Sequence, residues 1–250
     1  MSDLHVTGRI RNLERARRML DGLPELPLNF ELDQRDEFTA ENGWHLDHYR
    51  QPLPPEPPGP PLEQGSWAAG RRLMADYEFA DPSIVRAVYY DNHPLEGRDI
   101  LLEGRFLMLR FLLGLRVSDV EEVTTEIDAR PVRRWGWNYR TLQGHLEMGQ
   151  MDYTVLKWMD TGEVEFRIDA FSKPARIDNI IVRLGFAIFG RYMQRRFARH
   201  ALARMREVVR DELVAVATGV PRERVQRIGN RSGMHRADEA AGGQARRQTS

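Results

Sequence analysis

The hydrophobic period of this chain changes at Pro174, and this change constrains the fold more than any other feature. Before it, in EVEFRIDAF (163–171), apolar residues alternate with charged ones, which is typical of a β-strand with one wet face. After it, apolar residues recur every three to five positions from Ile177 to Val208, and the pattern continues to about Thr218. The sequence therefore predicts a run of strands followed by one long helix.

The region between residues 84 and 171 predicts a sheet of about six mostly antiparallel strands, because β-forming residues dominate it. Such a sheet packs well against one amphipathic helix when it curls and the helix lies in its concave face. We therefore expect an α+β fold, a curved antiparallel sheet gripping a long C-terminal helix. Where the helix does not fill the curve, an apolar cavity remains for a small molecule.

Two neighbouring segments of this region divide less clearly into strands. The segment RDILLEGRFLMLRFLLGLRV (98–117) is long and apolar, and we expect Gly104 and Gly114 to mark bulges, bends or a turn within it. The segment EEVTTEI (121–127) alternates and predicts a further strand.

The chain as a whole is expected to have three parts. Residues 1–64 form an N-terminal extension with a short helix, a strand near 43–53 and a proline-rich linker, since seven prolines stand between 52 and 61. Residues 65–219 form the helix-grip domain. Residues 220–250 lack periodicity and carry seven arginines against three acidic residues, which predicts a disordered basic tail.

Composition excludes several classes of function. The absence of cysteine excludes disulfides, thiolate nucleophiles and cysteine-ligated metals. The 37 basic residues balance the 37 acidic ones, so no nucleic-acid partner is expected. The most apolar windows, 106–115 and 180–190, are shorter than the ~18 residues of a membrane span. We expect a soluble, cytoplasmic protein without a membrane span, and its oligomeric state stays open.

The stretch WGWNYRTLQGHLEMGQMDYTV (135–155) is the least ordinary part of the chain. Strand alternation places Trp137, Tyr139 and Thr141 on one face and Asn138 and Arg140 on the other. We expect the aromatic face to point into the concave side of the sheet, toward the terminal helix. These side chains are then core, pocket wall or both.

His145 and Glu147 follow in the predicted hairpin connection, near its tip. They could be half of a metal site, but a metal would need a third and a fourth ligand. They could also satisfy backbone groups of the turn, or stand as polar groups at the mouth of a pocket. Acid–base chemistry by His145 is a further alternative, although no nucleophile partners it. We expect neither a metal nor a cofactor, and the sequence assigns no catalytic residue.

Three motifs give the chain a family resemblance. They are YRTLQGHLEMG, AFSKP and QRR, and they contribute Tyr139, Thr141, Leu142, Gly144, His145, Glu147 and Gly149, then Ala170, Phe171, Ser172 and Pro174, then Gln194, Arg195 and Arg196. From about residue 131 to 205 the chain resembles the family known as "domain of unknown function nineteen-ninety". That family is grouped with the START-like, helix-grip superfamily, whose members bind lipids, hormones or polyketide-like molecules, and some of which are cyclases or aromatases. The resemblance implies a pocket and no particular activity.

The sequence thus favours a protein of unknown role that binds a small hydrophobic or aromatic ligand, or a lipid, between helix and sheet. The expected ligand-binding residues are Trp137, Tyr139, Thr141, His145 and Glu147. The first alternative is a cyclase, aromatase or hydrolase acting in the same cavity. The second is a structural or interaction protein whose cavity is filled by its own side chains. Arginines spread along the terminal helix, such as Arg195 and Arg199, form a solvated face or contact an anion.

Overall fold

The computed structural model describes residues 3–106, 109–176 and 180–220. Its elements are β1 (Leu4–Val6), α1 (Leu13–Gly22), the 3₁₀ turns η1 (Leu23–Glu25) and η2 (Leu32–Glu37), β2 (His45–Leu53), α2 (Ser66–Ala75), β3 (Val85–Tyr90), β4 (Asp99–Phe106), β5 (Leu109–Ile127), β6 (Arg130–Thr141), β7 (Glu147–Trp158), β8 (Val164–Pro174) and α3 (Ile180–Thr218). The described strands form one antiparallel sheet in the order β1-β3-β4-β5-β6-β7-β8-β2. The predicted tail, 220–250, lies outside the described residues beyond Val220.

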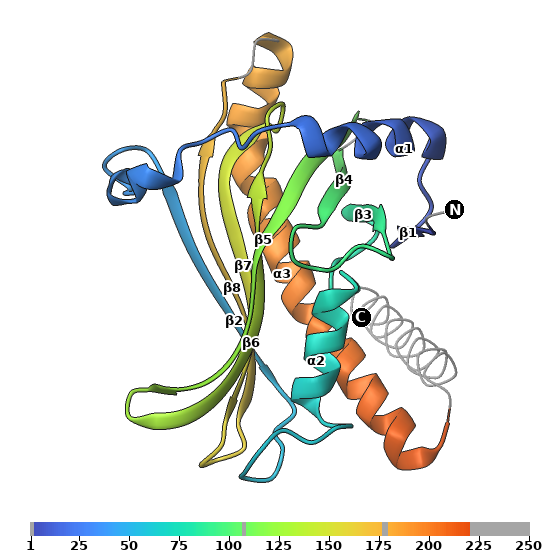
Figure 1. Ribbon diagram of the computed structural model, residues 1–250, viewed down its shortest axis with the longest axis vertical. Helices are drawn as coiled ribbons and strands as arrows, with labels where there is room; N and C mark the ends of the chain where they lie inside the picture. Colours follow the sequence, from blue (N-terminus) through green and yellow to red (C-terminus); the bar gives the residue numbers. More distant parts are fainter. Residues whose placement is uncertain (1–2, 107–108, 177–179, 221–250) are drawn as a thin grey trace, which may run out of the picture.

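The sheet is curved, and the long helix α3 runs along it together with α2 (Figure 1). The predicted α+β class, with a curved antiparallel sheet and a long C-terminal helix, is therefore confirmed. One large core joins α2 and α3 to a single face of the sheet, and Trp137, Tyr153 and Phe166 are among its buried members. Trp137 and Tyr139 face this helix layer, as strand alternation predicted.

A second, smaller core lies on the opposite face, where α1 packs on β3 and β4. Val88 and Leu101 contact Leu20 of α1 there, while their strand neighbours Ala87 and Ile100 belong to the large core. Strands β3 and β4 thus bury side chains on both faces, which explains why apolar residues follow one another in them, as in 100–102, instead of alternating with polar ones.

Strand β5 corrects the predicted division of residues 98–127. The segment 98–117 is two strands, β4 and the start of β5, and 121–127 is the end of β5 rather than a separate strand. The register of β5 against β6 shifts between Val117 and Val120, so a bulge stands where the two segments were divided. Gly114 lies inside β5, where a Cβ would stand 2.6 Å from a methyl group of Leu23, so the glycine permits the close approach of η1.

The N-terminal segment is joined to the rest of the sheet. Strand β2, which the sequence analysis placed in an extension before residue 65, pairs along its whole length with β8. The proline-rich segment that follows β2 is held through the carboxylate of Glu56. This carboxylate accepts hydrogen bonds from the backbone N–H groups of Leu62 and Trp67. It also pairs with the buried ammonium of Lys157 at 2.7 Å. The division into an extension (1–64), a helix-grip domain (65–219) and a disordered tail (220–250) stays a prediction.

Candidate functional site

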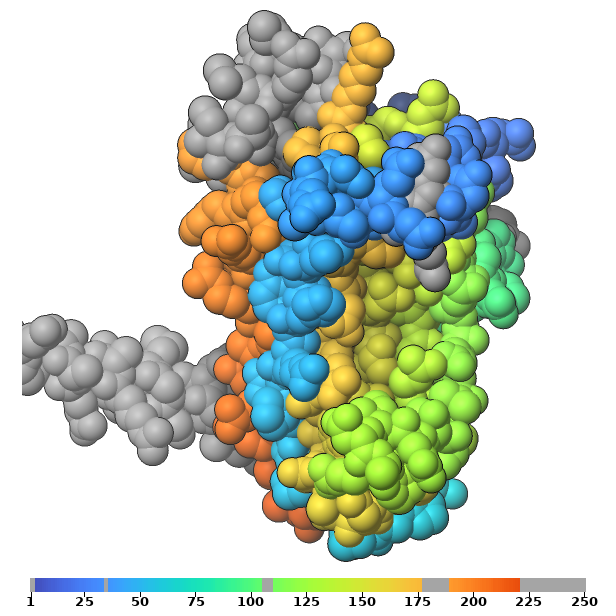
Figure 2. Space-filling model, turned by 90° about the vertical axis from the view of Figure 1, so that its left-hand side faces the viewer, coloured from blue at the N-terminus to red at the C-terminus, as the bar shows by residue number. Residues whose placement is uncertain are grey.

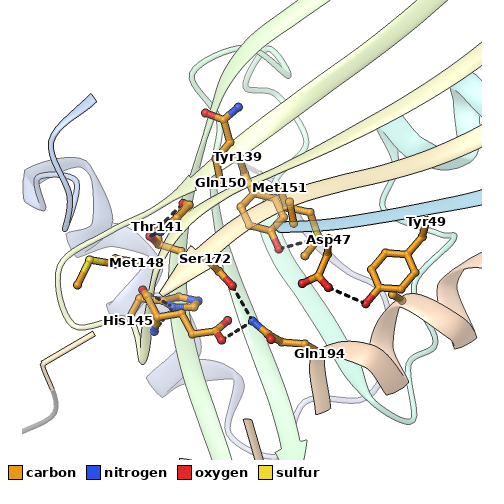
Figure 3. A pocket seen from close by; sticks show the side chains of 14 residues that line it. Asp47, Tyr49, Tyr139, Thr141, His145, Met148, Gln150, Met151, Ser172 and Gln194 are labelled. Carbon is orange, nitrogen blue, oxygen red and sulfur yellow. Dashed lines mark hydrogen bonds between the residues drawn. The ribbon is translucent and has the colours of Figure 1, made fainter. Parts of the chain in front are cut away.

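A polar pocket opens at one end of the layer between sheet and helix (Figure 3). Its volume is about 50 Å³. A site for a whole drug-sized ligand has roughly 300–1,000 Å³, whereas a buried water needs roughly 10–15 Å³. The pocket therefore accommodates a few waters or one end of a small molecule. It is lined by Asp47, Tyr49, Tyr139, Thr141, His145, Glu147, Met148, Gly149, Gln150, Met151, Ala170, Ser172, Gln194 and Ala198.

Aromatic side chains pack together in the described part of this layer around Trp137. The ring centroid of Tyr153 lies 4.9 Å from that of Trp137 and 4.7 Å from that of Phe79. The ring centroid of Tyr77 lies 5.0 Å from that of Phe79. Trp137 therefore does not line the pocket, although the sequence analysis placed it among the ligand-binding residues; it packs in the closed core. Around Trp137, the space between helix and sheet is therefore occupied by the protein's own rings.

The wall of the pocket is built by register across three strands. Gly149 pairs with Ser172 of β8, and its backbone N–H donates to the hydroxyl of Thr141 in β6 at 2.9 Å. A side chain at position 149 could not fit, because a Cβ would stand 2.1 Å from the carbonyl oxygen of Phe171 and φ is +149°. The glycine of the motif thus lets three strands approach closely at the pocket.

Glu147 is the carboxyl group of this pocket. The sequence predicted that Glu147 lies in the connection between two strands, but it is the first residue of β7. Its side chain lies on the concave face of the sheet and points toward α3. The side-chain amide of Gln194 donates to this carboxyl and, at 3.0 Å, to the hydroxyl of Ser172. Burial raises the pKa of Glu147 to about 7, while the amide of Gln194 and the charge of Arg191 act in the opposite direction.

His145 lies in the connection between β6 and β7, and its ring contacts the backbone of Glu147 across the turn. Nδ1 lies 3.0 Å from both the backbone nitrogen and the carbonyl oxygen of Glu147, so it accepts from the N–H in one tautomer and donates to the carbonyl in the other. Burial lowers the pKa of His145 to about 4, which keeps the ring neutral near pH 7. The acid–base group that titrates near neutrality in this pocket is therefore Glu147 rather than His145.

Tyr139 and Thr141 complete the predicted set of residues. The hydroxyl of Tyr139 donates toward the thioether of Met151 at 3.5 Å, and burial holds the pKa of this phenol well above its usual value. Thr141 donates to the side-chain oxygen of Asn29 at 2.6 Å, which ties the N-terminal segment to the pocket wall. Four of the five predicted residues thus lie together around one pocket: Tyr139, Thr141, His145 and Glu147.

The contribution of β2 was not predicted, and the predicted ligand-binding residues included none from α3, although the cavity was expected between that helix and the sheet. Asp47 forms two hydrogen bonds with Arg191, at 2.5 and 2.9 Å, and the Arg191 guanidinium lowers the pKa of the carboxyl. Tyr49 donates to the same carboxylate at 3.3 Å. Ser172 and Gln194 lie in two of the motifs on which the family resemblance rests, and these motifs were the sequence signal that could have identified them as pocket residues.

A wider groove adjoins the pocket on the surface between β2 and α3. It has a volume of about 570 Å³, and Asp47 and Tyr49 line both openings. Among the described residues, no cluster of three or more His, Asp or Glu side chains could hold a metal ion. No helix in the described part of the chain is long and apolar enough to cross a membrane.

Comparison with known proteins finds one family. The model of the DUF1990 family, "Domain of unknown function", matches residues 33–204. No curated protein matches the chain. Among solved structures, one described as "Crystal structure of Ara h 8.0201" covers 65% of this chain and 98% of its own, with 9% identity and a TM-score of 0.33. A similarity at this level carries no argument about ligand or activity.

Proposed function

The chain belongs to the DUF1990 family of unknown function, and we propose that it is a START-like, helix-grip protein that binds a small organic molecule at the pocket around Glu147. The arrangement of one curved antiparallel sheet around a long C-terminal helix supports the helix-grip assignment. Binding requires less of the geometry of the site than catalysis does, because it needs only an opening and a few polar groups that orient a ligand.

One observation carries the proposal. The carboxyl of Glu147 lies in a pocket with an uncharged hydrogen-bond partner, Gln194, where the neighbouring layer is closed by packed rings. Among the described residues, Gln194 is the one side chain that donates to this half-buried carboxyl. A carboxyl with few partners is costly for a fold, and such groups gather at functional sites. A ligand hydroxyl, carbonyl or amide would supply the missing hydrogen bond.

The size of the pocket defines what enters it. About 50 Å³ admits one end of a molecule and not an enclosed lipid. Its apolar lining side chains, such as Met151, Ala170 and Ala198, would contact the carbon atoms next to the polar end. We therefore propose a ligand with a neutral hydrogen-bonding end, rather than the fully enclosed hydrophobic molecule that the sequence favoured.

The test fills the pocket without changing its charge. Ala170→Val adds two methyl groups at the pocket wall, and Ala217→Val makes the same change at an exposed position of α3. Fluorescence titration with phenylnaphthylamine, a neutral aromatic amine, should give about tenfold weaker binding to Ala170→Val and unchanged binding to Ala217→Val. Equal affinity of both variants, or no binding to the wild-type protein, would contradict the proposal and favour a filled, structural interior.

A catalytic role is the second candidate, and the pKa of Glu147 favours it. A carboxyl that titrates near pH 7 can both accept and donate a proton at neutrality, which suits general acid–base catalysis. If a bound ligand is also turned over, Glu147→Gln should abolish turnover while phenylnaphthylamine still binds. Turnover that survives Glu147→Gln would exclude this role for the carboxyl.

A further inference from the structure

The groove between β2 and α3 continues the pocket toward solvent. It is lined by Asp47, Tyr49, Tyr192, Arg195 and Arg199. Figure 2 shows α3 and β2 side by side on this face of the molecule. Because Asp47 and Tyr49 line both spaces, a molecule whose end enters the pocket would lay its remainder along the groove.

The groove carries a net positive charge. The carboxylate of Asp47 is already paired with Arg191, so it is neutralised locally. Arg195 and Arg199 are exposed, and among the described residues no carboxylate lies within 4.0 Å of either guanidinium. His45 does not add to the charge near pH 7, since burial, and then the charge of Arg191, lower its pKa.

The two arginines are placed to act together. They stand four residues apart in α3, so their side chains project from the same side of the helix one turn apart. Guanidinium groups bind carboxylate, sulfonate and phosphate oxygens through paired N–H donors. The Nε of Arg199 donates to the backbone carbonyl of Arg195 at 3.3 Å, which leaves the terminal NH₂ groups of its guanidinium for a ligand. Two guanidinium groups at one groove, neither paired with a described carboxylate, therefore form a site for one anionic group.

Aromatic surface lies next to these charges. Tyr192 is 53% exposed although its ring is large and apolar, and Tyr49 stands on the strand across the groove. Exposed aromatic rings beside guanidinium groups suit a ligand with a planar apolar body, because the rings contact its faces while the guanidinium groups bind its charge.

We infer that the ligand is an aromatic or otherwise planar acid, whose anionic group binds Arg195 and Arg199 and whose neutral end enters the pocket at Glu147. The inference rests on the proposed binding function and gives it a chemical class. The opposite orientation would bring the anion against the carboxyl of Glu147, beside the paired carboxylate of Asp47.

The experiment compares two fluorescent probes that share one ring system. Anilinonaphthalene sulfonate carries an anionic group, and phenylnaphthylamine lacks it. In the full chain, the double substitution Arg195→Gln and Arg199→Gln should weaken the binding of the sulfonate about tenfold and leave the amine unchanged. Arg206→Gln, at an exposed position further along α3, is the matched control and should change neither probe. Added salt should weaken the sulfonate alone.

The outcomes separate this inference from the proposed function. If Ala170→Val weakens both probes but the double arginine variant binds the sulfonate normally, the anion site is wrong and the pocket stands. If Ala170→Val weakens neither probe, the proposed function itself fails. If the arginine variant binds the sulfonate normally but no longer sediments with phosphatidylglycerol vesicles, the arginines dock a membrane and the inference is overturned.

Discussion

Two carboxyl groups stand near opposite ends of strand β7, Glu56 buried and Glu147 half-buried, and they have different surroundings. Glu56 meets Lys157, near the strand's C-terminal end, and accepts two backbone N–H groups, and the nearby proline-rich segment closes over it. Glu147, the first residue of the strand, has an amide donor from α3 as its one side-chain partner among the described residues, and it faces a pocket. Full satisfaction marks the first carboxyl as structural, while incomplete satisfaction beside an open space marks the second as a candidate site.

The largest expected effect comes from breaking the satisfied pair. Lys157→Met leaves a buried carboxylate without its cation, and it should lower the free energy of unfolding by about 3–5 kcal/mol. The chain provides a matched control in its one other lysine, Lys173, which donates to the backbone carbonyl of Asn42 at 2.9 Å. Lys173→Met should cost about 1 kcal/mol or less. Urea unfolding measures both, and equal costs would mean that the Lys157 pair does not hold the proline-rich segment.

Glu147→Gln should change the free energy of unfolding less than Lys157→Met does, and the direction of the change depends on pH. The folded protein binds the Glu147 proton more tightly than the unfolded chain, since its pKa rises from 4.5 to about 7. Wild-type protein thus has this stabilisation below pH 4.5 and loses it as the pH rises through 7. The variant should match wild type near pH 4.5 and exceed its stability at about pH 8 by about 2–3 kcal/mol.

The control for this substitution has the opposite sign. Glu163 is exposed and hydrogen-bonded to Arg130, which lowers the pKa of the carboxyl. Its stabilisation is present above its ordinary pKa and is lost as the pH falls, so Glu163→Gln should be slightly less stable than wild type at neutral pH. Urea midpoints across the pH range compare the two variants. A Glu147→Gln variant that is less stable than wild type at about pH 8 would mean that its carboxylate is well partnered.

The sequence predicted features that depend on local periodicity. Alternation placed Trp137 and Tyr139 on the helix side, and a spacing of two residues predicted that His145 and Glu147 interact across their turn. The change of period at Pro174 predicted the order of strands and the final helix. In each case the physical cause lies within a few residues of the chain, where a pattern can record it.

Contacts between residues far apart in the chain depend on the topology of the fold, and the local sequence pattern does not record them. Glu147 meets Gln194 from 47 positions away, and Arg191 meets Asp47 from 144 positions away, because β2 closes the far edge of the sheet beside α3. The filling of the helix–sheet layer also depends on ring packing between distant elements. Gly114 shows the same limit: its closeness to Leu23 is visible only in the folded chain, so the glycine was interpreted as a bulge, a bend or a turn.

The most direct test of the account is a carbon-detected NMR titration of the Glu147 carboxyl, with and without phenylnaphthylamine. The account predicts a midpoint near pH 7 in the free protein. It predicts a midpoint moved by the bound probe, upward as the rings of the probe displace water and downward to the extent that its N–H donates to the carboxylate. A midpoint near the ordinary value of 4.5, or one that saturating probe does not move, would contradict the claim that this carboxyl belongs to a ligand-binding pocket.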